Sequence, residues 1–103
     1  MAFEHTKERY ASFGIATSLP HTIIDTFWDV LDNYLKDVVP LDRTLTFRLA
    51  NHSDKLSFEY HDIKRQILIV FDYNTPFDPF FPEIVNITDN AGIETIILPH
   101  EFD

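Results

Sequence analysis

The spacing of apolar residues changes along the chain from a helical period to a period of two. Between Ser18 and Val39, apolar side chains recur every three or four residues, which is typical of a helix with one buried face. Pro20 suits the first turn of this helix, and Pro40 disfavours helical backbone at the residue before it. The apolar positions of the predicted helix are Ile23, Ile24, Phe27, Trp28, Leu31, Tyr34 and Leu35.

Five segments after this helix have a strand pattern. Apolar and polar residues alternate in the first two, whereas the third is apolar on both faces, which favours a central strand. A four-residue turn between the first two would place Leu49 opposite Leu56, Phe47 opposite Phe58, and both apolar faces in register. The predicted strands are Thr44–Asn51, Lys55–Tyr60, Gln66–Tyr73, Glu83–Thr88 and Ile93–Leu98.

A further strand is predicted before the helix, at Tyr10–Thr17, where Gly14 indicates a bulge or a close backbone approach. In the last hairpin Gly92 is placed for a positive φ. The order strand, helix and five strands predicts an α+β fold, with one helix packed on a mainly antiparallel sheet of five to six strands. We expect a single domain over residues 1–103, with residues 1–8 disordered.

The composition indicates a folded protein and excludes cysteine chemistry. The chain is 45% apolar and contains ten phenylalanines, which is too much apolar content for a disordered chain. It has no cysteine, so disulfides, thiolate catalysis and cysteine-ligated metals are excluded. No apolar run has the length of a signal peptide or of a membrane span, so we expect a cytoplasmic protein that does not enter a membrane.

The negative charge is concentrated in the C-terminal part. The net charge is −9, and residues 66–103 contain seven acidic residues and neither lysine nor arginine. Phosphate backbones are bound through lysine and arginine side chains. We therefore do not expect the chain to bind nucleic acid.

Residue patterns that accompany catalysis are not found in the sequence. The two glycines are isolated and cannot form a phosphate-binding loop, and no serine lies in a nucleophile motif. His21 and Asp25 lie four residues apart, but two ligands are too few for a metal site. We expect no catalytic residue, no metal and no cofactor, and hence no enzyme. A carboxylate pair brought together by folding is the remaining route to catalysis.

Two segments are candidate partner-binding surfaces. Asp25, Asp29 and Asp32 follow one face of the helix, either as a solvated face or as an acidic docking surface that mimics DNA phosphates. The segment 74–82 contains Phe77, Phe80 and Phe81 among three prolines. These rings either cover the open face of the sheet near Leu68 and Val70 or form an exposed apolar patch for a partner or for self-association.

Three segments also occur in a known family. They are Arg9, Tyr10, Phe13 and Gly14 before the helix, Leu19, Pro20, Phe27, Trp28, Leu31 and Asp32 in it, and residues 95–102 at the end. On these residues the chain resembles a family of small Gram-positive bacterial proteins, domain-of-unknown-function family nine-sixty. The resemblance implies a bacterial cytoplasmic protein, with some members on mobile chromosomal cassettes, and it implies no catalytic residues. Residues 74–82 do not match the family.

The sequence therefore favours a non-catalytic protein-interaction domain with an unidentified protein partner. The alternative is an acidic DNA-mimic inhibitor of a nucleic-acid-binding enzyme, encoded on a mobile element.

Overall fold

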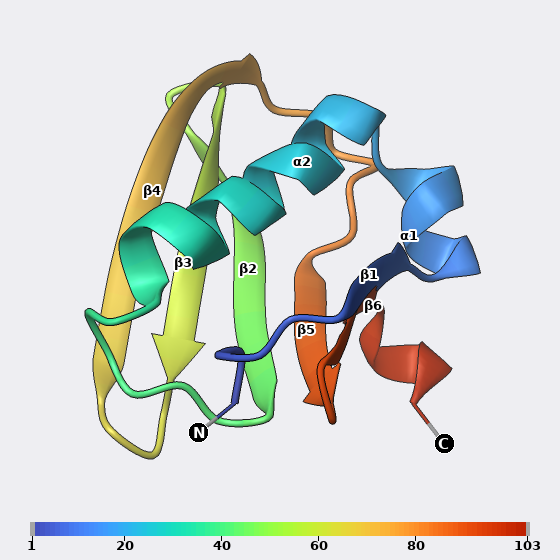
Figure 1. The fold of residues 1–103 in the computed structure, drawn as a ribbon. Helices are drawn as coiled ribbons and strands as arrows, with labels where there is room; N and C mark the ends of the chain where they lie inside the picture. The colour runs from blue at the N-terminus through green and yellow to red at the C-terminus, as the bar shows by residue number, and fades with distance from the viewer. Residues whose placement is uncertain (1, 103) are drawn as a thin grey trace.

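The computed structural model describes residues 2–102 as a six-stranded sheet with one main helix across one face (Figure 1). Two short helical turns, a π-helical η1 and a 3-10 η2, complete the fold. The elements are β1 (Glu8–Ala11), α1 (Phe13–Ser18), α2 (His21–Val30), η1 (Leu31–Leu35), β2 (Thr44–His52), β3 (Lys55–Asp62), β4 (Ile67–Pro76), β5 (Ile84–Asn90), β6 (Ile93–Ile97) and η2 (Pro99–Glu101).

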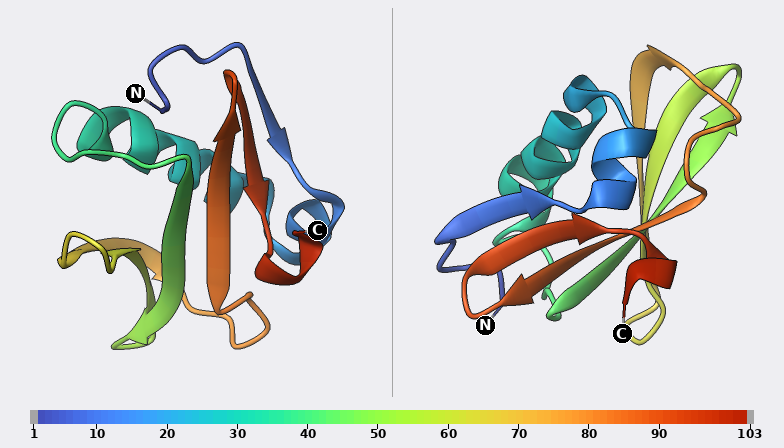
Figure 2. Two further views of the ribbon diagram at one scale, coloured as in Figure 1. Left: turned by 90° about the horizontal axis from the view of Figure 1, so that it is seen from below. Right: turned by 90° about the vertical axis from the view of Figure 1, so that its right-hand side faces the viewer.

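The strands lie in the order β1-β6-β5-β2-β3-β4. β1 runs parallel to β6, and the other neighbouring strands are antiparallel. The sheet twists strongly between its two ends, so that β1 and β4 run in clearly different directions (Figure 2). The predicted α+β layout is confirmed in its main helix and strand-rich sheet, but the sheet is mixed rather than purely antiparallel.

Helix α2 forms the core with the central strands. Phe27 lies edge-on to Phe47 of β2 and Phe58 of β3, with ring centroids 5.3 and 4.7 Å apart. All three side chains are fully buried. Most of the predicted apolar stripe is buried, whereas Trp28 is half-buried and Tyr34 is exposed. The helical period therefore identified the buried face of the helix correctly.

The segment Tyr10–Thr17 is not the continuous strand that the sequence predicts. β1 ends before Ser12, whose hydroxyl accepts a hydrogen bond from the backbone N–H of Ile15 (3.2 Å) and caps α1. Gly14 therefore lies in a helix and not in a bulge. The close contacts at Gly14 come from side chains rather than from another backbone segment, because a Cβ there would lie 2.8 Å from Cδ1 of Leu98.

The β2–β3 hairpin pairs two residues away from the predicted register. Leu49 lies opposite Phe58 rather than Leu56, and the other pairs shift in the same way. The turn consists of Ser53 and Asp54, with φ values of 54° and 66°. Such left-handed two-residue turns match the twist of the flanking strands, which favours this shorter turn. A shift of two leaves every side chain on its predicted face.

β4 is an edge strand, not the central strand predicted from its apolar residues. It pairs with β3 and ends the sheet. Its odd-numbered side chains pack toward the core, whereas Leu68 and Val70 remain 58% and 47% exposed. In the last hairpin the turn is Ala91-Gly92, and the predicted positive φ of Gly92 is confirmed at 92°.

The N-terminal segment is packed against the sheet. Phe3 is fully buried, and its backbone N–H donates a hydrogen bond to Oδ2 of Asp89 (2.7 Å). This contact contradicts the predicted disorder for the part of residues 1–8 that the structure describes, and Met1 lies outside the described residues. Within residues 2–102, none of the helices has the length and apolar character needed to cross a membrane.

Candidate interaction surfaces

The aromatic segment 74–82 begins as the last part of β4 and then folds over the end of the sheet. The backbone N–H of Phe77 donates a hydrogen bond to the carbonyl of Asp54 (3.0 Å). Phe77 and Phe81 are half-buried against the core, with their rings edge-on and 6.3 Å apart. These two phenylalanines therefore anchor the segment. They do not cover Leu68 and Val70, contrary to one of the two expectations.

Phe80 lies at the tip of this segment and is 93% exposed. Its backbone N–H donates a hydrogen bond to Oδ1 of Asp78 (2.9 Å), and the N–H of Phe81 donates to the carbonyl of Asp78 (3.0 Å). The turn is therefore held on both sides of Phe80. Of the three predicted phenylalanines, one is presented to solvent and two support it.

The acidic face of α2 is only partly free. Asp25 is 3.6 Å from Nε2 of His21, in a pair that is exposed on both sides. Asp29 accepts a hydrogen bond from Nδ2 of Asn33 (2.5 Å). Both carboxylates remain exposed. They are the part of the predicted row that can meet a partner.

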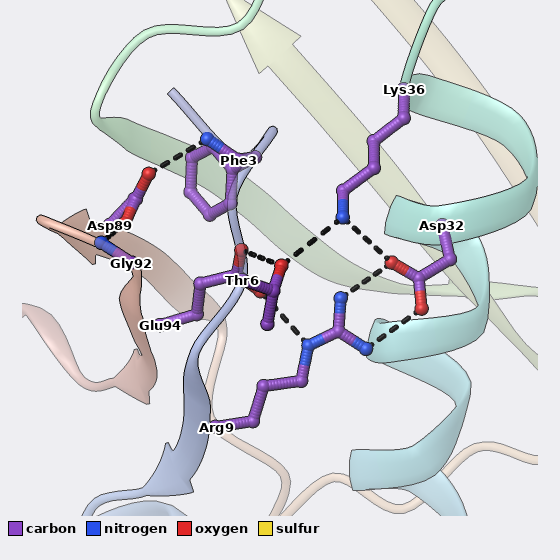
Figure 3. A network of polar contacts seen from close by, with 8 residues as sticks. All are labelled: Phe3, Thr6, Arg9, Asp32, Lys36, Asp89, Gly92 and Glu94. Atoms are coloured by element: carbon purple, nitrogen blue, oxygen red, sulfur yellow. Dashed lines mark hydrogen bonds and ion pairs between the residues drawn. The ribbon is translucent and has the colours of Figure 1, made fainter. Parts of the chain in front are cut away.

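Asp32, the third carboxylate of the row, is neutralised within the chain. Both terminal nitrogens of Arg9 donate to it, at 2.7 and 2.5 Å, and Nζ of Lys36 lies 3.2 Å away (Figure 3). The hydrogen bond from Arg9 is the main reason that the pKa of Asp32 lies below its usual value. A bidentate arginine pair of this kind fixes the carboxylate in one geometry.

The same arginine forms a network that the sequence analysis missed. Glu94 of β6 is fully buried and accepts hydrogen bonds from Nε of Arg9 (2.9 Å) and the hydroxyl of Thr6 (2.6 Å) (Figure 3). The guanidinium also lies 4.7 Å from the ring centre of Trp28. Arg9 thus connects β1, β6 and the helix. Because Arg9 and Glu94 are 85 positions apart, local spacing gives no signal for their contact.

One serine, histidine and aspartate lie together on the open face of the sheet. Asp72 accepts hydrogen bonds from the hydroxyl of Ser57 and from Nδ1 of His52, the latter at 3.0 Å. The Ser57 hydrogen bond is the main cause of the lowered pKa of Asp72. An activated serine needs the histidine as its own base. Here the carboxylate lies between the two, so the arrangement is not that of a Ser-His-Asp triad.

The structure has several surface cavities but, among the residues it describes, no cluster of metal ligands. In the part of the chain that the structure describes, no group of three or more His, Cys, Asp or Glu side chains could hold a metal ion. A cavity of about 510 Å³ lies between the N-terminal segment and residues 36–41, with Phe3 and Val39 in its wall. None of the predicted site residues line this cavity.

Together these features define a small domain with a mixed sheet, one main helix and a supported aromatic tip. The chain belongs to the family described as Staphylococcal protein of unknown function (DUF960), whose model matches residues 8–101. The family resemblance seen in the sequence is therefore confirmed, and the matched range also spans residues 74–82, which were expected to lie outside the resemblance.

A solved structure from the same wider group of bacteria has the same fold. It is described as the protein of unknown function from Enterococcus faecalis and is 32% identical in sequence. The match covers 94% of this chain and 92% of that one, with a TM-score of 0.90. No curated protein matches the chain. The comparisons thus give the family, the Gram-positive bacterial group and the fold.

Proposed function

We propose that this chain is a non-catalytic protein-interaction domain that binds its partner through Phe80. Phe80 combines a solvent-exposed side chain with a backbone turn that is held in place. Phe80 is 93% exposed, and the turn that presents it is held by hydrogen bonds to Asp78. Leaving a large apolar side chain in water is unfavourable, and packing it into a pocket on another protein removes that cost.

The supporting residues make Phe80 suited to binding. Phe77 and Phe81 pack against the core, so the loop is ordered before any partner arrives. Binding then has less conformational entropy to lose, which leaves more of the contact free energy for affinity. Aromatic side chains at the centre of an interface are among those whose removal costs most.

The alternative function, an acidic inhibitor that mimics DNA, is supported by the net charge of −9 and by the exposed Asp25 and Asp29. The pairing of Asp32 with Arg9 and Lys36 reduces the charge that this face offers. For this reason we place the DNA-mimic function second.

The two functions differ in their response to salt and to substitution. We would capture partners from a lysate of the source bacterium, at low and high salt, with the wild type, Phe80→Ser and Asp25→Asn/Asp29→Asn as baits. Phe13→Ser is the matched control, because Phe13 is 82% exposed on a different part of the surface. Asp32 is left unchanged because its substitution would also remove the contact with Arg9.

A partner lost with Phe80→Ser but kept by Phe13→Ser and at high salt would support the proposal. With that partner purified, Phe80→Ser should weaken binding by about 2 kcal/mol, which is about 30-fold in Kd. A partner lost with the aspartate variant and at high salt would instead support DNA mimicry, since exposed charges are screened beyond about 8 Å at physiological ionic strength. Capture of no partner by any bait would count against both functions.

A further inference from the structure

The two edges of the sheet differ in how well they are protected against pairing with another strand. β1 is four residues long and contains Glu8 and Arg9, and short, charged edges resist such pairing. β4 is ten residues long, and its part Ile67–Phe71 has five apolar residues with no charge, proline or glycine. Among the described strands, β4 pairs with β3 alone. Its outer row of backbone groups is therefore free to pair.

The same strand carries apolar side chains on the face of the sheet away from α2. Leu68 and Val70 are 58% and 47% exposed there. Their neighbours across β3 are His61 and Glu59, so the apolar pair lies at the edge and the polar residues lie inside it. An additional strand beside β4 would cover this pair with its own side chains.

The sequence of β4 is complementary to itself in an antiparallel register centred on Ile69. A twofold axis perpendicular to the sheet keeps side chains of the same face opposite one another. With the axis at Ile69, Leu68 of each copy lies opposite Val70 of the other, and the exposed apolar pairs cover each other. An axis at Val70 would set Leu68 against Asp72, and an axis at Phe71 would set Val70 against Asp72. Both of these registers place an apolar side chain opposite a charge.

The charges around β4 also favour an antiparallel second copy. Lys64 lies just before the strand, and Asp72 and Asp78 lie at its far end or beyond it. Antiparallel pairing brings the basic end of one copy toward the acidic end of the other. Two copies that each carry −9 repel at long range, but the uncharged centre of β4 adds nothing to this repulsion.

We infer that β4 is the interface of a homodimer, in which two copies pair antiparallel about Ile69 and their sheets become continuous. The occupant of the free edge is thus a second copy of this chain. The interface uses no residue of the aromatic tip, so it is independent of the function proposed for Phe80.

The oligomeric state in solution tests this inference. Sedimentation velocity of the wild type over a range of concentrations should show a species of twice the chain mass of 12.1 kDa. Leu68→Lys/Val70→Lys places four lysines at the twofold axis and should give the chain mass alone. Phe13→Lys, at a residue that is 82% exposed elsewhere, should leave the dimer unchanged. A wild type that stays monomeric, or a dimer that survives the lysine variant, would overturn the inference.

Cysteine cross-linking tests the register and does not depend on the lysine variant folding. The wild type has no cysteine, so introduced thiols are the only ones present. Opposed residues of antiparallel strands have Cα atoms about 4.5 or 5.5 Å apart, within disulfide range. Diagonal neighbours are about 7–8 Å apart, at or beyond that range.

Under oxidation, a mixture of Leu68→Cys and Val70→Cys chains, one of them carrying a size tag, should form disulfides between the two variants. Each variant alone should cross-link at least tenfold less. Equal cross-linking of each variant alone, or none in the mixture, would overturn the pairing about Ile69.

Discussion

Arg9 of β1 and Glu94 of β6 form an ion pair in which the glutamate side chain is fully buried. β1 is the parallel edge strand, and it comes from the opposite end of the chain to β6. The pair therefore joins the two termini of the chain, and through Asp32 it also joins them to η1, the helical turn that follows α2. Breaking it should affect the whole fold rather than one element.

We predict that Arg9→Met lowers the free energy of unfolding by about 3–5 kcal/mol, because it leaves the buried Glu94 without its counter-charge. Glu94→Gln should cost less, about 1–3 kcal/mol, since an amide oxygen can still accept a hydrogen bond. Arg9→Met/Glu94→Leu should be more stable than Arg9→Met alone. Urea denaturation of the three variants measures the effect, and equal stability of the single and double variants would contradict it.

Acid should destabilise the protein partly through Glu101. The hydroxyl of Ser12, followed by the backbone N–H groups of Leu98 and Gly14, lowers the pKa of Glu101 below its usual 4.5. Because the pKa of Glu101 is lower in the folded state, its ionised carboxylate stabilises the fold. This stabilisation is present above the unfolded-state pKa and is lost as the pH falls through the folded-state pKa. Urea midpoints measured between neutral pH and acid should fall less steeply below about pH 4.5 for Glu101→Gln than for the wild type.

Alkaline pH should lower the stability of the protein through ionisation of Tyr60. This side chain is 2% exposed, and burial raises its pKa from 10.0 to about 12. Because the pKa of Tyr60 is higher in the folded than in the unfolded state, the stabilisation that the neutral side chain contributes is complete below the unfolded-state pKa. It is lost as the pH rises through the folded-state pKa. We therefore expect the wild type to lose stability between pH 10 and about 12, and Tyr60→Phe to lose less. Thermal melting across this range is the measurement, with Tyr34→Phe, at a tyrosine that is 51% exposed, as the control.

Two adjacent turn residues should respond in opposite directions to substitution. Gly92 has a φ of 92°, and a Cβ there would lie 2.6 Å from the carbonyl oxygen of His5. We expect Gly92→Ala to lower the free energy of unfolding by about 1–3 kcal/mol, through backbone strain and displacement of the N-terminal segment. Ala91 has a φ of 53°, so Ala91→Gly should instead stabilise the protein by up to about 1 kcal/mol. Melting temperatures that move in the same direction would contradict this reading of the turn.

The candidate surfaces were predictable in part. The sequence shows the acidic row, which includes Asp25 and Asp29, and the aromatic segment, which includes Phe80. The sequence did not show which side chains of these surfaces are available to a partner. Asp32 is paired by an arginine 23 positions away, and two of the three phenylalanines pack against the core. Exposure of a side chain depends on contacts between distant segments, and a local pattern does not contain them.

The sequence by itself determined the main helix with its buried face and the five strands that follow it, because periods of 3.6 and 2 depend only on the local backbone. It also determined the positive φ at Gly92. The tertiary structure decided the rest. The register of β2 and β3 was ambiguous because a shift of two residues preserves both faces. The edge position of β4 was hidden because its outer apolar residues read as buried, and the pairing of β1 with β6 required the whole chain to be folded.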